Sequence, residues 1–171
     1  MSLHEDSSTL RYVEATVGRI KKHLLTYHRE DDRTKGILAK FRGVQLLRRR
    51  SSSPGTYNSG MFSHSSGIMF VAPRDSSGKR RTEKSLNKTI VHELAHATRF
   101  KYPGEKSHST SWKSAWVFLL KVCTEELGMV VDVPCSSVTF YGLSKRDCPT
   151  CDWETDPTFC PEYKGPPRGH G

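Results

Sequence analysis

Long hydrophobic runs are missing from this 171-residue sequence. No segment has the eighteen or so consecutive apolar residues typical of a membrane-spanning helix. Charged residues also occur throughout residues 1–30, where a secretory signal would be apolar. We therefore expect neither a membrane span nor a secretory signal, but a soluble intracellular protein of the nucleus or cytoplasm. The length fits one modest domain, with or without short extensions.

Cysteine is also scarce. There are five cysteines, an odd number that a framework of paired disulfides would not use. Cys148 and Cys151 have the spacing of a zinc knuckle, and Cys160 follows nearby. A structural zinc site in the tail would need a fourth ligand, for which Cys135 and His170 are candidates. The alternative is a set of ordinary thiols in a flexible tail.

Basic residues are abundant, and the net charge is +9. They are clustered, and such clusters can bind DNA because each phosphate contact releases counterions. The alternative is that such a cluster is a solvated surface. The candidate nucleic-acid-binding residues are Arg48, Arg49, Arg50, Lys79, Arg80 and Arg81.

Apolar residues at spacings of three and four predict three amphipathic helices. The first covers residues 8–27 and packs one stripe on the core. The second carries Leu86, Ile90 and Leu94 on one face. The third follows an N-cap candidate at residues 109–111 and ends before Gly128.

Short segments rich in β-branched and aromatic residues predict a small sheet. Strands are expected within residues 37–47, 56–62 and 67–72, and the last two could form a hairpin. The polar segment 74–84 should be an exposed loop, and residues 138–143 could form a further strand. The sequence thus indicates a small protein of the α+β class.

The most distinctive motif is His92-Glu93-Leu94-Ala95-His96. On a helix, its two imidazoles project from one face, one turn apart, and can bind a tetrahedral Zn²⁺ ion. The carboxylate between them can reach a water molecule bound to the metal. The alternative is a helix whose histidines merely face solvent, which the apolar stripe opposite makes less plausible.

A catalytic zinc site normally has three protein ligands and one open position. His108 is the preferred third ligand, because it follows a Pro103-Gly104 turn that can reverse the chain. It also precedes a helix N-terminus, which disfavours the charged imidazolium and keeps the ring available to a metal. The competing candidates are Glu105, Glu125, Glu126 and His64.

Together, the zinc-helix motif and the later His108-Ser-Thr-Ser-Trp112 segment resemble the SprT-like zinc metallopeptidases and, more loosely, their WLM relatives. The similarity covers about residues 8–145, and only the two histidine motifs are distinctive. Ser109 departs from the pattern, since many members have glycine after the third histidine.

This resemblance implies a zincin-like domain over residues 1–145, in which a short sheet packs on the zinc helix and a second amphipathic helix. A cysteine-containing tail then covers residues 146–171. Several members of the family cleave proteins crosslinked to DNA. The implied site consists of the zinc ligands His92, His96 and His108 and the general base Glu93.

The resulting hypothesis is a zinc-dependent metallopeptidase that hydrolyses protein or peptide substrates with a metal-activated water. The candidate substrates of this peptidase are proteins associated with DNA or crosslinked to it, and its expected role is then in DNA repair. By the same resemblance, residues 67–72 are expected to form an edge strand that pairs with the substrate. The alternative is a non-catalytic, zinc-stabilised nucleic-acid-binding protein. Glu93 distinguishes them, because a structural zinc site needs no carboxylate at an open position.

Overall fold

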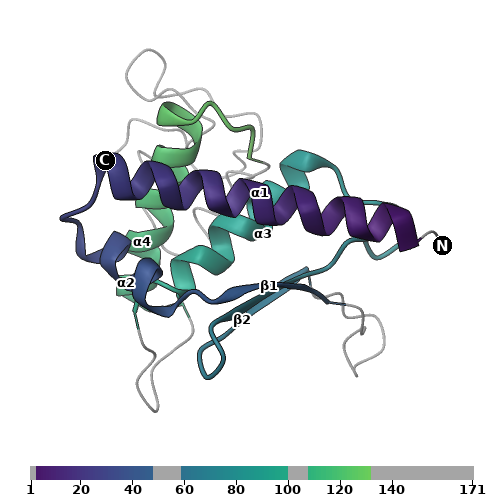
Figure 1. Cartoon of the computed structure of the whole chain (residues 1–171), viewed down its shortest axis with the longest axis horizontal. Helices are drawn as coiled ribbons and strands as arrows, with labels where there is room; N and C mark the ends of the chain where they lie inside the picture. The colour runs from purple at the N-terminus through teal and green to yellow at the C-terminus, as the bar shows by residue number, and fades with distance from the viewer. Residues whose placement is uncertain (1–2, 48–58, 100–107, 132–171) are drawn as a thin grey trace, which may run out of the picture.

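A computed structural model describes residues 3–47, 59–99 and 108–131 of the chain. Within this part, helices and a small sheet occur in separate stretches, so the expected α+β class is confirmed (Figure 1). In chain order the elements are α1 (Leu3–Tyr27), α2 (Asp32–Lys40), β1 (Gly43–Leu46), β2 (Gly60–Ser63), β3 (Ile68–Val71), α3 (Glu83–His96), α4 (Thr110–Lys121) and the π-helix η1 (Val122–Glu126).

The three described strands form one mixed sheet in the order β1-β3-β2. β2 pairs with β3 in an antiparallel hairpin, as expected, and β1 pairs with β3 in parallel. β3 is therefore the central strand, and the expectation that residues 67–72 form a free edge is wrong. Because both neighbours use its backbone N–H and C=O groups, an extended peptide cannot add to this strand.

Residues 37–47 also differ from the expected single strand, because Ile37 lies in helix α2. Asp31 caps this helix, its side chain accepting a hydrogen bond from the Arg33 N–H at 2.8 Å. Asp32 in the first turn and Lys40 in the last turn both complement the helix dipole. Capping and terminal charge thus favour a short helix, and the strand begins only at Gly43.

Helix α1 begins five residues before the predicted start and ends at the predicted Tyr27. Its stripe of Val13, Val17, Ile20 and Leu24 is buried. Helices α1 and α3 both contact the sheet, and α4 packs on α3 (Figure 1). Helix α3 therefore contacts α1, α4 and the sheet, and these contacts fix its position. None of the described helices is long and apolar enough to cross a membrane.

The C-terminal residues 132–171 lie outside the described part of the chain. The boundary between a domain over residues 1–145 and a tail over 146–171, and the strand over 138–143, therefore remain predictions. The same holds for the tail zinc site and its ligand candidates Cys135, Cys148, Cys151, Cys160 and His170.

Candidate metal centre

Helix α3 carries the first two histidines of the centre. It begins after Thr82, whose side chain accepts a hydrogen bond from the Ser85 N–H, and it ends at His96. Leu86, Ile90 and Leu94 on its apolar face are buried, and this fixes the rotation of the helix. His92 and His96 are consequently half-buried on the face turned toward α4.

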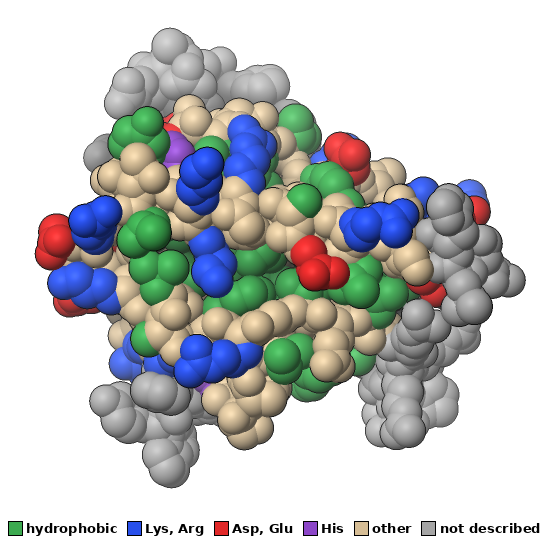
Figure 2. All heavy atoms as spheres, viewed as in Figure 1, with side chains coloured by type: hydrophobic (Ala, Val, Ile, Leu, Met, Phe, Trp, Pro, Cys, Tyr) green, Lys and Arg blue, Asp and Glu red, His purple; other side chains and the backbone are tan. Residues whose placement is uncertain are grey.

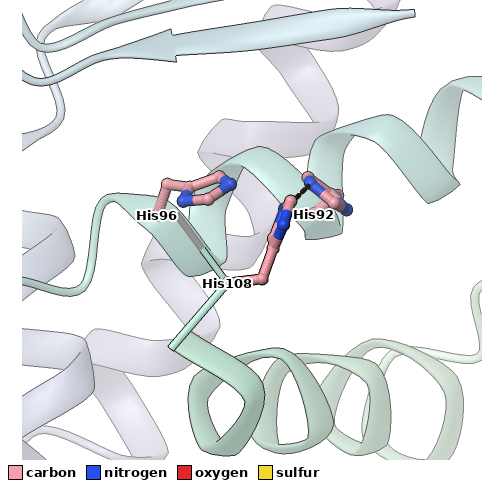
Figure 3. A group of neighbouring side chains, drawn as sticks. All are labelled: His92, His96 and His108. Atoms are coloured by element: carbon pink, nitrogen blue, oxygen red, sulfur yellow. Dashed lines mark hydrogen bonds between the residues drawn. The ribbon is translucent and has the colours of Figure 1, made fainter. Parts of the chain in front are cut away.

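His108 comes from the other side of the centre, directly before the helix α4. Ser109 is the N-cap of this helix and accepts a hydrogen bond from the Trp112 N–H. The three imidazoles point toward one another (Figure 3), with ring centroids 5.0 to 5.3 Å apart. Their ligand nitrogens all lie within 4.8 Å of one another. The structure thus brings together the three residues that the sequence suggested as zinc ligands.

The distance between the Nε2 atoms of His92 and His108 is 3.1 Å. Zinc–nitrogen bonds of 2.0–2.1 Å in a tetrahedral site place two ligand nitrogens about 3.3 Å apart. The observed separation is close to this value, so the two rings fit a shared ion with little movement. Without a metal, one nitrogen must donate a proton and the other accept it.

Trp112 forms one wall of the centre. Its ring centroid lies 4.8, 5.3 and 4.4 Å from those of His92, His96 and His108, and Trp116 stacks on it. The Trp112 indole N–H also donates a hydrogen bond to the His92 carbonyl. Both tryptophans are buried core residues, and Trp112 limits the positions that the imidazoles can adopt.

Burial controls the protonation of these groups. It lowers the pKa of His92 to about 4, with smaller contributions from His108 and Lys88. Burial, together with Lys113, also lowers the pKa of His108, and in both rings the shift favours the neutral imidazole that a metal requires. Burial alone raises the pKa of Glu93 to about 8, which makes its carboxyl group neutral at pH 7 in the metal-free protein.

Those competing third ligands that the structure describes are not part of the trio. Glu125 is an exposed residue of η1. The His64 ring is 6.2 Å from that of His96 and packs on Phe62 instead. Glu126 lies at the end of η1, where it contacts His23 and His28. Glu105 is outside the described residues.

The candidate nucleic-acid-binding residues do not share one environment. Lys79 and Arg80 are exposed, but Arg81 is only 8% exposed and donates hydrogen bonds to interior carbonyl and hydroxyl groups. Arg81 is therefore a structural residue, whereas Arg48–Arg50 lie outside the described residues. On the face shown in Figure 2, basic side chains are dispersed and have acidic side chains among them.

Comparison with known proteins places the chain in a different class from the one suggested by the zinc helix. The family model described as Phycodnaviridae minor capsid protein P4 matches residues 1–165. A curated relative, minor capsid protein P4 of Paramecium bursaria Chlorella virus 1, is 49% identical over 160 residues. The match covers 93% of this chain and 88% of the relative. No solved structure matches.

The family is thus one of viral minor capsid proteins. The chain belongs to the Phycodnaviridae minor capsid protein P4 family.

The assignment to the SprT-like metallopeptidases is therefore wrong. So are the predicted protease activity and the alternative of a nucleic-acid-binding protein, because the matching family is one of capsid proteins. The motif was misleading for a physical reason. Histidines at i and i+4 form a helix face that can bind a metal. A structural metal site and a catalytic one can share this geometry, so the motif alone does not indicate hydrolysis.

The fold forms a second group of ligand-type residues that sequence spacing does not reveal. The structure gathers His23, His28 and Glu126, whose ligand atoms all lie within 4.8 Å of one another. From the sequence, Glu126 is a competing ligand for the zinc helix, and nothing in the spacing indicates His23 or His28. Their five-residue spacing is not a recognised ligand pattern on one helix, so only the fold reveals the group.

Proposed function

We propose that this chain is a minor structural component of a viral capsid and associates there with other virion proteins. The observation that carries this proposal is the 49% identity to a minor capsid protein, which extends over 93% of the chain. The match also covers 88% of the relative, so nearly the whole of that protein has a counterpart here. For the location, we propose that the chain is synthesised inside the infected cell and is then incorporated into the virion.

Within this role we propose that His92, His96 and His108 bind a structural Zn²⁺ ion. The support is geometric: three imidazoles from two helix termini converge, and two of their nitrogens have nearly the spacing of a tetrahedral site. The ion would join the end of α3 to the start of α4, across the segment of residues 100–107. The zincin-like arrangement of helix and sheet stays a prediction about architecture, and no hydrolysis is assigned to it.

The capsid proposal can be tested on purified virus particles that encode this chain. Intact particles are washed, treated with protease to remove adsorbed proteins, and analysed by quantitative mass spectrometry. We expect the chain to remain with the particles in fewer copies than their most abundant shell protein. A non-structural viral protein from the same infected cells is the control for contamination. Presence in the cell extract with absence from the particles would contradict the proposal.

The zinc proposal needs a separate measurement on the purified full-length chain. Bound zinc is counted by atomic mass spectrometry after dialysis, in the wild type, His108→Asn and His64→Asn. We expect His108→Asn to bind one equivalent less than the wild type, because the site loses a ligand. His64→Asn is the matched control, since this neighbouring histidine is outside the trio, and it should retain the wild-type zinc content. Equal zinc in all three proteins would contradict the assignment.

A further inference from the structure

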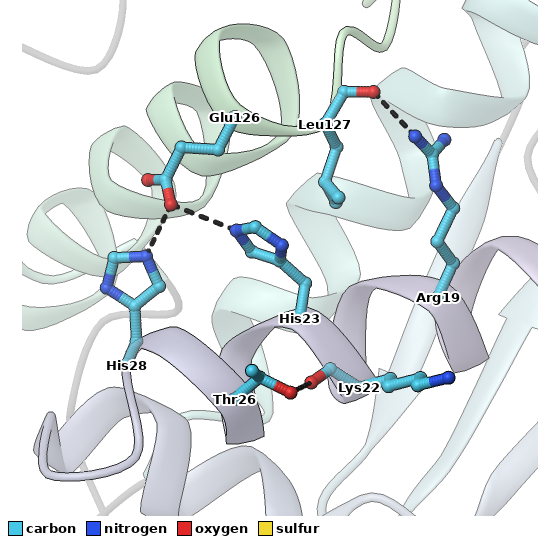
Figure 4. Close-up of polar contacts among 7 residues, drawn as sticks. All are labelled: Arg19, Lys22, His23, Thr26, His28, Glu126 and Leu127. Atoms are coloured by element: carbon cyan, nitrogen blue, oxygen red, sulfur yellow. Dashed lines mark hydrogen bonds and ion pairs between the residues drawn. The ribbon is translucent and has the colours of Figure 1, made fainter.

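Two histidines and one glutamate meet where the end of α1 faces the end of η1 (Figure 4). His23 lies in the last turns of α1, and His28 directly follows its last residue. Glu126 is the last residue of η1 and is about a hundred positions further along the chain. Only folding brings these side chains together.

Both imidazoles approach the same atom of the carboxylate. The Nε2 atoms of His23 and His28 lie 2.9 and 2.8 Å from Glu126 Oε1. Two imidazole nitrogens and one carboxylate oxygen form a donor set that zinc uses in proteins, with a fourth position left to water. Tetrahedral zinc would hold each nitrogen about 3.3 Å from the oxygen, so the two nitrogen–oxygen distances are slightly shorter than a shared ion requires.

The backbone around the cluster is held by other contacts. In η1 the Leu127 N–H bonds to the Val122 carbonyl, five residues back, as in a π-helical turn. Such turns occur frequently at functional sites. Arg19 of α1 donates a hydrogen bond of 2.7 Å to the Leu127 carbonyl and so joins the two elements beside the cluster (Figure 4).

The histidine rings are positioned as well. The His28 ring packs edge-on against Phe118 of α4, and its backbone N–H bonds to the Leu24 carbonyl. The His23 ring lies against Tyr27. These contacts limit the rotation of both rings. Metal binding therefore costs less side-chain entropy than it would with freely rotating histidines.

Solvent reaches the cluster. The side chains of His23, His28 and Glu126 are 15%, 25% and 38% exposed. An ion can therefore enter from solution, and a water molecule can complete its coordination. In the metal-free protein each ring can donate a hydrogen bond from Nε2 to Glu126. Metal binding instead requires the Nε2 lone pairs and moves the remaining ring protons to Nδ1.

We propose that His23, His28 and Glu126 form a second zinc site that fastens the end of α1 to the end of the α4–η1 helix. It is separate from the centre formed by His92, His96 and His108 and shares no residue with it. The ion would crosslink two segments that are about a hundred residues apart in the sequence.

The experiment is a Zn²⁺ titration of the metal-free full-length chain, followed by calorimetry and by the imidazole ¹⁵N signals in NMR. The variants are Glu126→Gln and His28→Asn. Glu125→Gln is the matched control, because it removes the neighbouring exposed carboxylate and leaves the cluster intact. We expect each site variant to lose one zinc equivalent or to weaken it at least tenfold, while the control titrates like the wild type.

The NMR signals make the result specific. In the wild type, zinc should shift the Nε2 signals of His23 and His28 and leave Nδ1 as the protonated nitrogen in both rings. Equal zinc binding in the wild type and both site variants would overturn the proposal. Zinc saturation that leaves the His23 and His28 signals unchanged would overturn it too. The variant His108→Asn distinguishes the two sites. It should lose the zinc bound by His92, His96 and His108 and still bind zinc at His23, His28 and Glu126.

Discussion

At the scale of single residues, Arg81 shows how burial changes the meaning of a charge. In the sequence it belongs to a basic run, but in the fold its guanidinium is enclosed near the start of α3. Its hydrogen bonds join three separate segments, so the charge supports the structure and does not form a surface. Its acceptors are the carbonyls of Ser59, Ala72 and Ser85 and the hydroxyls of Ser85 and Thr89.

The substitution Arg81→Lys should lower the free energy of unfolding by about 2–4 kcal/mol, because an ammonium cannot reproduce the planar set of donors and leaves buried acceptors unsatisfied. Chemical denaturation monitored by circular dichroism measures the effect. Arg80→Lys is the control, since Arg80 is exposed and its guanidinium donates a hydrogen bond of 3.2 Å to the Ser8 hydroxyl. Its effect should stay within about 0.5 kcal/mol. Similar losses in both variants would contradict the structural role of Arg81.

Cys123 offers a second prediction at this scale. It is fully buried on the apolar side of the α4–η1 helix, and burial raises the pKa of its thiol to about 12. The thiolate that reacts with alkylating agents is therefore almost absent at pH 8. We expect Cys123 to remain unmodified by iodoacetamide in the folded protein and to react fully in denaturant, as measured by peptide mass spectrometry. Rapid native modification would contradict its burial.

At the scale of elements, the packing of α2 depends on one glycine. A Cβ atom at Gly36 would lie 1.6 Å from the Thr98 carbonyl oxygen, just beyond the end of α3. The helix can approach the end of α3 this closely only because position 36 has no side chain. Since α3 carries His92 and His96, this contact also helps to position the candidate metal centre.

Gly36→Ala should therefore destabilise the protein by about 3 kcal/mol or more, because backbone must move to accept the methyl group. Gly18→Ala in α1 is the matched control, because a Cβ there meets nothing within 4 Å. It should raise stability by about 0.5–1 kcal/mol, since alanine favours a helix interior over glycine. Thermal unfolding of the two variants beside the wild type makes the comparison. Equal effects of the same sign would mean that α2 does not pack against the Thr98 backbone as described.

At the scale of the whole molecule, the two candidate zinc sites connect distant segments. One joins α3 to α4, and the other joins α1 to η1. An ion at either site would stabilise the folded chain, because a ligand that binds only the folded state shifts the unfolding equilibrium.

Removing zinc with a chelator should lower the melting temperature of the full-length chain. An ion at a hundred times its dissociation constant stabilises the fold by about 2.7 kcal/mol, which corresponds to roughly 5–10 °C for a chain of this size. Differential scanning calorimetry with added Zn²⁺ or EDTA measures the difference. His108→Asn should show a smaller difference than the wild type. Identical melting temperatures with zinc and with chelator would contradict a stabilising role for the metal.

The sequence alone determined those features that depend on local spacing. Apolar periodicity located α1, α3 and α4, since a helix buries residues three and four positions apart. It also suggested His92, His96 and His108 as one ligand set, because two of them share a helix face and the third precedes a capped helix. It missed α2, where the capping by Asp31 outweighs the weak strand pattern of residues 37–47.

Tertiary structure alone decided the rest. It made β3 a central strand, buried Arg81, and brought His23 and His28 to Glu126, because each of these depends on contacts between segments far apart in the chain. The motif His92-Glu93-Leu94-Ala95-His96 could indicate a metal-binding face but not a reaction. Ligand geometry arises from the spacing of a few residues, whereas the role of a capsid protein depends on its whole surface and on the partners that meet it.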